Sequence, residues 1–180
     1  CFHAGEGTLL WSYTYACVFE ARMFEGGTAA TPAIHDGRVY TVAYDGQVKC
    51  INLESGELVW STHLIEDHGG RYPQWKYAGS PAVVGEFAVF DVGAEQGSTL
   101  ALDRKTGKKV WGTGSDGAGY ATPVPYNFGD MACFAVFKAE HMIGIRQPDG
   151  GELWRIPWKT SYDVNASTPT IRGEKLFMSS

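Results

Sequence analysis

Two stretches of the sequence gather the residue types that form binding sites. Residues 63–79, HLIEDHGGRYPQWKYAG, and residues 156–166, IPWKTSYDVNA, combine arginine, tyrosine and tryptophan with acidic and amide side chains. Arginine and large aromatic side chains dominate the energetic centres of protein interfaces. These stretches therefore predict a surface for a protein or small-molecule ligand. The candidate binding residues are Arg71, Tyr72, Trp75, Tyr77, Trp158, Tyr162, Asp163 and Asn165.

Other chemistries lack their sequence signatures. The chain has no Ser-His-Asp arrangement, no H-E-x-x-H motif and no EF-hand spacing, and its four cysteines form no C-x-x-C pair. We interpret the cysteines as small buried hydrophobic residues. The segment ALDRKTGKKVW at 101–111 places a glycine before a lysine, but it lacks the upstream glycine and the following Ser/Thr of a phosphate-binding loop. We therefore predict no catalytic residue and no metal ligand.

The composition restricts the classes of partner and fold. With 180 residues, 44% of them hydrophobic, the chain is long enough to bury the core of one domain. Its net charge of −5 argues against a nucleic-acid partner, because phosphate binding needs a basic face. No window approaches 18 consecutive apolar residues, so no transmembrane segment is predicted. The 23 glycines and 13% aromatic residues favour many short strands joined by tight turns.

The segment at 101–111 is one of four similar copies. The others are CFHAGEGTLLW at 1–11, CINLESGELVW at 50–60 and GIRQPDGGELW at 144–154, and each has a glycine four residues before its closing tryptophan. The four tryptophans are 49, 51 and 43 residues apart. A Ser-Pro or Thr-Pro pair recurs in phase, at 31, 80, 122 and 168. Two unrelated markers with one period indicate a repeat protein.

One period contains four short apolar runs separated by turns. From residue 32 the runs are separated by Asp36-Gly37, Asp45-Gly46 and Ser55-Gly56, which are typical hairpin turns. A repeated unit of four antiparallel strands is the signature of an all-β β-propeller. The aspartate that follows the tryptophan of WD repeats is absent, and the Gly-Gly pairs do not recur at the equivalent positions that kelch repeats require.

The four copies resemble a known family of repeats. ALDRKTGKKVW matches the tryptophan-docking pattern A-x-D-x-x-T-G-K-x-x-W of the pyrroloquinoline-quinone-like (PQQ-like) propeller repeat. This family includes quinoprotein alcohol dehydrogenases and non-enzymatic proteins similar to the assembly lipoprotein BamB. The resemblance implies an exported bacterial protein in the periplasm or outside the cell, although the sequence itself contains no signal peptide. Copies one and four depart from the pattern at His3 and Arg146.

The repeat residues have a structural interpretation. The glycine supplies the positive φ of the turn, the aspartate accepts backbone N–H groups across it, and the tryptophan buries its ring against the neighbouring blade. Blade docking, and not catalysis, is therefore predicted for Trp11, Trp60, Asp103, Thr106, Gly107, Trp111 and Trp154.

The register divides residues 1–180, a single propeller segment, into three whole blades and two partial ones. The whole blades are expected at 32–64, 81–113 and 123–158, with the end of a blade at 1–13 and the start of another at 167–180. Because open strand edges promote aggregation, we expect either a piece of a larger protein, with the rest of the propeller missing from this chain, or closure by pairing of the end strands.

Two functions are compatible with this architecture. The first is a non-catalytic binding or scaffold module whose ligand contacts the loop residues named above, with no cofactor. The second, implied by the resemblance, is part of a PQQ- and calcium-dependent alcohol dehydrogenase. Trp75 or Trp158 would then stack on the quinone, and Asp163 and Asn165 would ligate calcium. The adjacent cysteine pair typical of those enzymes is absent, which favours the binding module.

Overall fold

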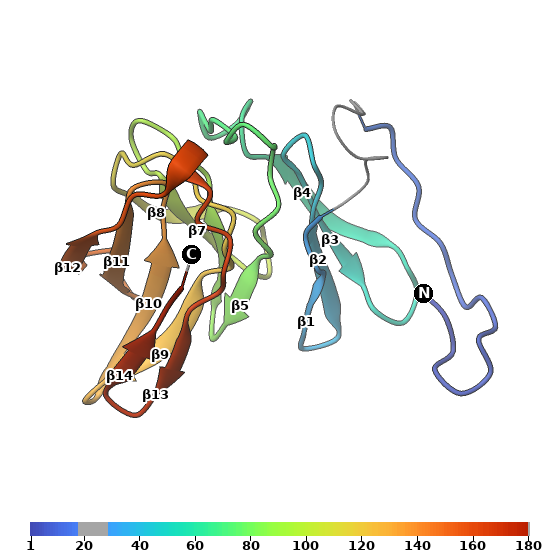
Figure 1. The fold of residues 1–180 in the computed structure, drawn as a ribbon. Helices are drawn as coiled ribbons and strands as arrows, with labels where there is room; N and C mark the ends of the chain where they lie inside the picture. Colours follow the sequence, from blue (N-terminus) through green and yellow to red (C-terminus); the bar gives the residue numbers. More distant parts are fainter. Residues whose placement is uncertain (18–28, 180) are drawn as a thin grey trace.

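The computed structural model describes residues 1–17 and 29–179 (Figure 1). In these residues it contains three four-stranded antiparallel sheets, each a meander in chain order, and one two-stranded sheet. The first sheet comprises β1 (Ala33–His35), β2 (Arg38–Val42), β3 (Gln47–Asn52) and β4 (Leu58–His63). The second comprises β5 (Ala82–Val84), β6 (Phe87–Asp91), β7 (Thr99–Asp103) and β8 (Lys109–Thr113). The third comprises β9 (Val124–Phe128), β10 (Met131–Phe137), β11 (His141–Arg146) and β12 (Glu152–Pro157). A 3-10 turn, η1 (Ser161–Asp163), precedes the hairpin of β13 (Thr170–Arg172) and β14 (Lys175–Phe177).

The sheets stand side by side along an arc, as the blades of a propeller do (Figure 1). The connections between consecutive sheets lie at the upper end of Figure 1, and we call this end the loop face. The turns of the hairpins β1–β2, β9–β10 and β13–β14 point to the opposite end. The predicted all-β propeller of four-stranded antiparallel blades is therefore confirmed.

The hairpin turns follow the turn chemistry of the sequence. Between β1 and β2, Asp36 has φ 48° and Gly37 has φ 69°. A tight two-residue turn whose twist suits antiparallel strands needs positive φ at both central positions, which Asp-Gly tolerates best. His35 and Arg38 are consequently opposite each other as the first pair of the hairpin.

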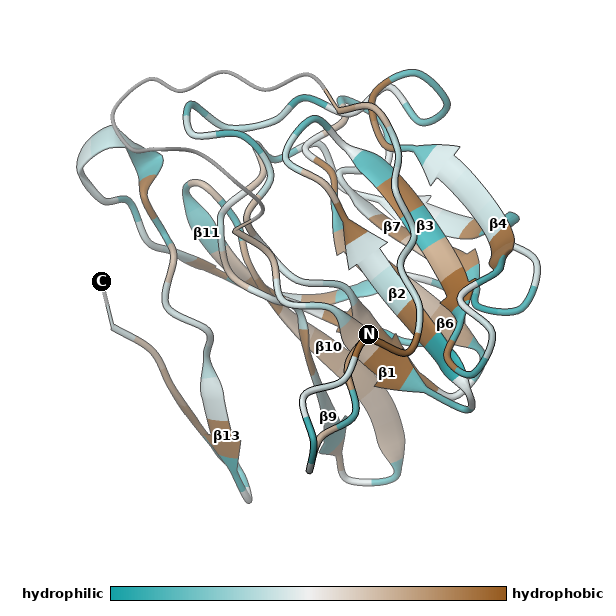
Figure 2. Cartoon of the chain, turned by 90° about the vertical axis from the view of Figure 1, so that its right-hand side faces the viewer, coloured by the Kyte–Doolittle hydropathy of each residue, from teal (hydrophilic) through white to brown (hydrophobic). Residues whose placement is uncertain are grey.

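The core lies between neighbouring sheets, and the inner strands of the second and third sheets are buried on both faces. Phe90 of β6 packs in one cluster with Tyr40 and Val48 of the first sheet. Val89 is adjacent to Phe90 in β6 and lies on the opposite face of the strand, where it packs with Phe134 of the third sheet. Hydrophobic residues accordingly concentrate along the strands, while the loop face is largely hydrophilic (Figure 2).

A bulge recurs at one position in every complete sheet. The register of the third and fourth strands shifts after Cys50, Ala101 and Gly144. Each of these small residues is paired with the tryptophan of its own repeat. A bulge bends and twists its strand, and here it occurs directly beside each tryptophan of the outer strand.

The N-terminal segment makes a short hairpin of its own, with a bridge between Phe2 and Leu9. It lies at one end of the arc and β13–β14 at the other (Figure 1). The interpretation of all four cysteines as buried residues is correct for Cys50 and Cys133 and wrong for Cys1 and Cys17, which are exposed. Cys1 and Cys17 belong to this terminal segment, which has no sheet on its outer side among the described residues.

Candidate functional site

Three of the repeat tryptophans contact the following repeat in the same way. Trp60 donates a 3.0 Å hydrogen bond from Nε1 to the carbonyl of Arg104, and its ring covers Gly107. A Cβ built on Gly107 would lie 2.7 Å from the ring, so any larger residue would displace it. The equivalent contacts join Trp11 to Leu53 and Gly56, and Trp111 to Gln147 and Gly150.

The turn beneath each tryptophan is held by a local acceptor. Asp103 Oδ1 accepts bonds from the backbone N–H of Lys105 and Thr106, at 3.0 and 2.7 Å, and from the Thr106 hydroxyl at 2.8 Å. The Thr106 hydroxyl and these amides favour the charged carboxylate and lower the pKa of Asp103. These local bonds fix the shape of the turn that the neighbouring tryptophan covers.

Trp154 differs from the other repeat tryptophans. Its Nε1 donates to the Tyr126 hydroxyl of its own sheet, at 2.9 Å, and its ring lies against Gly144. It also lines a mostly apolar cavity of about 540 Å³ between the third sheet and β13–β14.

A second cavity opens on the loop face and is formed by several of the candidate binding residues. It has a volume of about 300 Å³. Arg71 and Tyr72 come from the β4–β5 connection, and Tyr162 and Asp163 come from η1, so two connections far apart in sequence meet there. We call this cavity the loop-face pocket. Gln74 and the small residues Gly117, Ala118 and Ala139 complete most of its wall.

Backbone strain marks the η1 side of the pocket. Tyr162 and Asp163 have φ 61° and 55°, in the left-handed region that disfavours residues with a Cβ. Tyr162 is 79% exposed, so burial of its ring does not explain the conformation. Non-glycine residues held in this region concentrate at functional sites.

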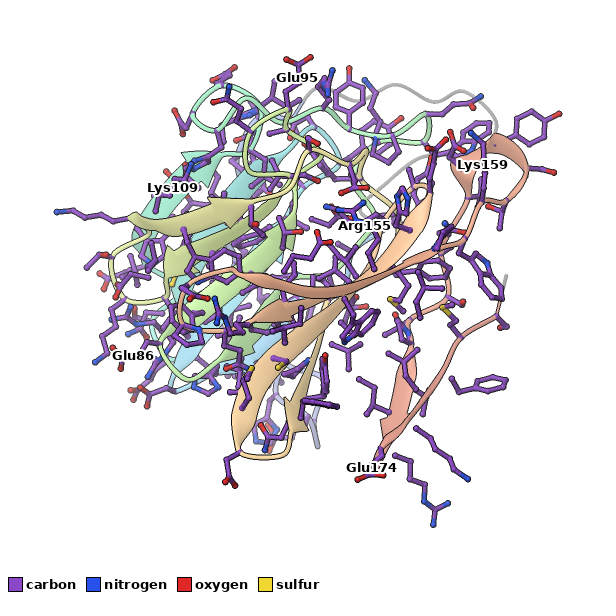
Figure 3. All side chains as sticks on the ribbon, turned by 90° about the vertical axis from the view of Figure 1, so that its left-hand side faces the viewer. Glu86, Glu95, Lys109, Arg155, Lys159 and Glu174 are labelled. Carbon is purple, nitrogen blue, oxygen red and sulfur yellow. The ribbon has the colours of Figure 1, made fainter. Side chains whose placement is uncertain are left out.

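Both positively and negatively charged side chains lie around the pocket. Arg71 pairs with Glu95 at 2.9 Å, and Lys159 pairs with Glu140 and lies 3.9 Å from Asp163. Glu95 and Lys159 lie at the same end of the molecule, and Glu174 lies at the other (Figure 3). The rim of the pocket can therefore pair with a ligand that carries both charged and aromatic groups.

The other four candidates do not line this pocket. Tyr77 is buried, its hydroxyl donates to the Val92 carbonyl at 2.8 Å, and burial raises its pKa. The backbone N–H of Trp75 donates to the Tyr120 hydroxyl at 3.1 Å. Trp158 packs edge-on against Phe137, at 6.4 Å between ring centres.

Asn165 is fully buried and ties three carbonyls together. Its Nδ2 donates to the carbonyls of Lys138, Ala139 and Trp158, at 2.8, 2.9 and 3.1 Å. Its Oδ1 accepts a bond from the Thr160 hydroxyl at 3.1 Å. The amide therefore fastens the chain that leaves the third sheet, a role that its position in a polar loop does not reveal.

Three of the residues proposed for PQQ and calcium are engaged in other contacts. The Asn165 oxygen is buried and already bonded, so it cannot reach a cation without breaking the contacts that hold its loop. Trp158 presents its ring to Phe137, and Asp163 faces Lys159. In the described part of the chain, no group of three or more His, Cys, Asp or Glu side chains is placed to hold a metal ion.

A buried ion pair beneath the loop face escaped the sequence analysis. Lys138, fully buried, pairs with Asp91 of the neighbouring sheet and donates to the Ser98 carbonyl at 3.0 Å. Asp91 also accepts a 2.8 Å bond from the Gly119 N–H. Three loops are thereby joined just below the pocket. The small residues of the pocket wall were missed too, because alanine and glycine carry no chemical signal; the glycine-rich run at 114–119 was the only indication.

Comparison with known proteins agrees with this architecture. The family model described as outer membrane protein assembly factor BamB matches residues 1–180. Quinohemoprotein alcohol dehydrogenase ADH-IIG of Pseudomonas putida is 30% identical over 118 residues, which cover 60% of this chain and 16% of that protein. BamB of Xanthomonas campestris pv. campestris is 33% identical over 86 residues, which cover 47% of this chain and 21% of that protein.

Two solved structures share the fold at 16% identity. BamB from Moraxella catarrhalis superposes with a TM-score of 0.55 over 84% of this chain and 40% of its own. The computationally designed protein Ika8 superposes with a TM-score of 0.58 over 97% of this chain and 47% of its own. The chain thus spans less than half the length of each of these proteins. In the described residues no helix has the length and apolarity to cross a membrane. Because the family model covers the whole chain and the structure shows the blades that its repeats predict, the chain belongs to the BamB family of PQQ-like repeat propellers.

Proposed function

We propose that the chain is a non-catalytic binding module in which the propeller is a rigid frame and the loop-face pocket receives a segment of a protein partner. The observation that carries this proposal is the convergence of Arg71, Tyr72, Tyr162 and Asp163, from two distant connections, on one cavity of about 300 Å³. Arginine and tyrosine in a concave site are the residues that most often anchor a partner. The family is described by an assembly factor for outer membrane proteins, and assembly of proteins also involves protein partners.

Rigidity beneath the pocket supports the same function. The Lys138–Asp91 pair and the Asn165 amide fix the loops that form its floor. A fixed site loses little conformational freedom on binding, so more of the contact energy remains as affinity. The family also supports our proposal that the protein is exported to the periplasm or beyond the cell.

Selection from a phage-displayed library of random short peptides tests the proposal. Peptides selected on the wild-type chain should lose most of their affinity for Arg71→Ala and for Tyr162→Ala, measured by fluorescence anisotropy. Arg172→Ala changes an exposed arginine of β13, which does not line the pocket, and should bind normally. A library that yields no binder, or binders that tolerate both pocket substitutions, would overturn the proposal.

A dehydrogenase role is the second candidate, favoured by the 30% identity to an alcohol dehydrogenase. The engaged Asn165 oxygen argues against it. Adding PQQ with Ca²⁺ should leave the melting temperature of the chain unchanged. A rise that grows with ligand concentration would favour the enzyme, because a ligand that binds only the native state stabilises it by RT ln(1 + [L]/Kd).

A further inference from the structure

The polar side chains of the loop-face pocket differ in how fully they are engaged within the protein. Arg71 is engaged twice, because its Nε donates to the Gly93 carbonyl at 3.4 Å and its Nη1 pairs with Glu95 at 2.9 Å. The Asp163 carboxylate accepts no hydrogen bond from any residue that the structure describes, and the Lys159 Nζ that pairs with it is 3.9 Å away. Asp163 is therefore the charged group of the pocket that is left to a ligand.

The rim of the pocket also carries more carboxylates than cations. Lys159 pairs more closely with Glu140 than with Asp163, so two carboxylates share one ammonium group. Arg71 and Glu95 balance each other. Two cations and three carboxylates leave a net charge of −1 on this rim. Because ion pairs between exposed side chains are weak, a cationic ligand can compete with Lys159 for Asp163.

Aromatic rings line the same cavity. Lys76 Nζ lies 3.8 Å from the centre of the Tyr72 ring, although Lys76 itself is buried and does not line the pocket. One tyrosine of the pocket thus already holds an ammonium group over its ring, an arrangement that the electron-rich face of the ring favours. Tyr162 is 79% exposed and directly precedes Asp163, so a cation held by that carboxylate can contact a second ring.

The small residues of the pocket wall suit a slender side chain. A Cβ built on Gly117 would lie 3.2 Å from the Cβ of Ala139, which leaves little room for a branched group beside them. The stems of lysine and arginine are unbranched and apolar, and they pack on such surfaces while the charged head reaches a polar group. A cavity of about 300 Å³ is large enough for one side chain of this kind.

Other ligand groups fit the pocket less well. Of the described residues that line it, Arg71 is the one cation, and its guanidinium already serves Gly93 and Glu95. An acidic group would also be repelled by Asp163. An apolar group would cover that carboxylate without offering a hydrogen bond, which is costly.

We propose that the loop-face pocket selects a lysine or arginine side chain of the partner segment. The cationic head pairs with Asp163 beside the Tyr162 ring, and the stem packs on Gly117, Ala118 and Ala139. This inference rests on the proposed function and makes it specific, because the partner must then present a basic residue.

Titration of the isotope-labelled chain with N-acetyl-lysine N-methylamide, followed by two-dimensional NMR, tests the selection. A chain of 19.6 kDa is small enough for this measurement. The amide signals of Gly117, Ala118 and Ala139 should move and reach a plateau as the concentration rises. The norleucine counterpart keeps the four-carbon stem and lacks the ammonium group, so it should leave these signals in place.

Asp163→Asn separates the charge of the pocket from its shape. Asparagine adopts the left-handed backbone as readily as aspartate does, so η1 should keep its conformation at φ 55°. The variant should raise the dissociation constant of the lysine derivative by about 10-fold or more, because a hydrogen bond between two charged groups is replaced by a weaker one. Glu174→Gln removes the same charge at the opposite end of the molecule (Figure 3) and is the matched control, which should bind as the wild type does.

Three results would overturn the inference: a lysine derivative that moves no pocket signal, a norleucine compound that binds equally well, or unchanged binding to Asp163→Asn. The peptide selection distinguishes this failure from failure of the proposed function. Peptides that require Arg71 and Tyr162 but contain no basic residue would leave the pocket as a peptide site and refute its preference for a cation. Peptides that lose affinity both when their basic residue is replaced by norleucine and when Asp163 is replaced by asparagine would support the inference and the proposed function together.

Discussion

The contact between a docking tryptophan and its turn glycine can be isolated by adding one methyl group. Gly107→Ala places a Cβ 2.7 Å from the Trp60 ring at a backbone φ of 72°. Gly37→Ala adds the same methyl group at φ 69°, where nothing lies within 4 Å. Both variants carry the strain of a left-handed alanine, and only the first displaces a ring.

The expected magnitudes follow from these two terms. The left-handed conformation costs about 1–2 kcal/mol for a residue with a Cβ. Trp60 is only 9% exposed, and complete truncation of a buried tryptophan costs about 3–5 kcal/mol. A ring that is displaced but retained should lose about a third of that, or roughly 1–2 kcal/mol. Gly107→Ala should therefore destabilise the chain by about 2–4 kcal/mol and Gly37→Ala by about 1–2 kcal/mol.

Urea unfolding, followed by circular dichroism and tryptophan fluorescence at one protein concentration, measures both variants. The native fluorescence of Gly107→Ala should also shift to longer wavelength, because the Trp60 ring becomes more hydrated. Equal losses of unfolding free energy in the two variants would refute the docking interpretation, since strain alone would then explain both.

Three further predictions concern the groups beneath the loop face and in the turns. Lys138→Met should lower the free energy of unfolding by roughly 3–5 kcal/mol, because Asp91 becomes a buried unpaired charge; a loss below about 1 kcal/mol in urea titrations would argue against the ion pair. Asn165→Ala leaves three loop carbonyls without their donor and should cost about 3 kcal/mol; calorimetry showing an unchanged melting temperature would contradict that role. The lowered pKa of Asp103, caused first by the Thr106 hydroxyl and then by backbone amides, means that the native state holds the carboxylate more strongly in its charged form than the unfolded chain does. The stabilisation from this carboxylate is present above the unfolded pKa of about 4 and is lost as the pH falls through the lower pKa of the folded state. Asp103→Asn should therefore flatten the fall in the free energy of unfolding between neutral and acid pH. An identical acid dependence of the wild type and the variant would count against the role of Asp103.

The sequence was sufficient to predict the architecture because the same structural pattern recurs in several copies of the repeat. The glycine-to-tryptophan spacing and the Asp-Gly turn at Asp36-Gly37 depend on local backbone geometry and recur in phase. Each copy independently indicates the same blade, so chance resemblance in one copy does not change the conclusion.

The binding surface was less predictable because the direction of a loop side chain depends on tertiary contacts. Residue type alone grouped Tyr72 and Tyr162 with Tyr77 and Asn165. The structure places the first two at the pocket and buries the other two against backbone carbonyls. Nothing in the local sequence distinguishes a polar side chain that fastens a loop from one that faces a ligand.

The central claim, that the propeller is a frame and the loop face binds, is tested most directly by one substitution with two measurements. Tyr162→Gly removes a 79% exposed ring and relieves a positive φ of 61°. The free energy of unfolding should therefore stay constant or rise by up to about 1 kcal/mol. Affinity for peptides selected on the wild type should fall at least tenfold. A variant that binds these peptides as tightly as the wild type would contradict the account.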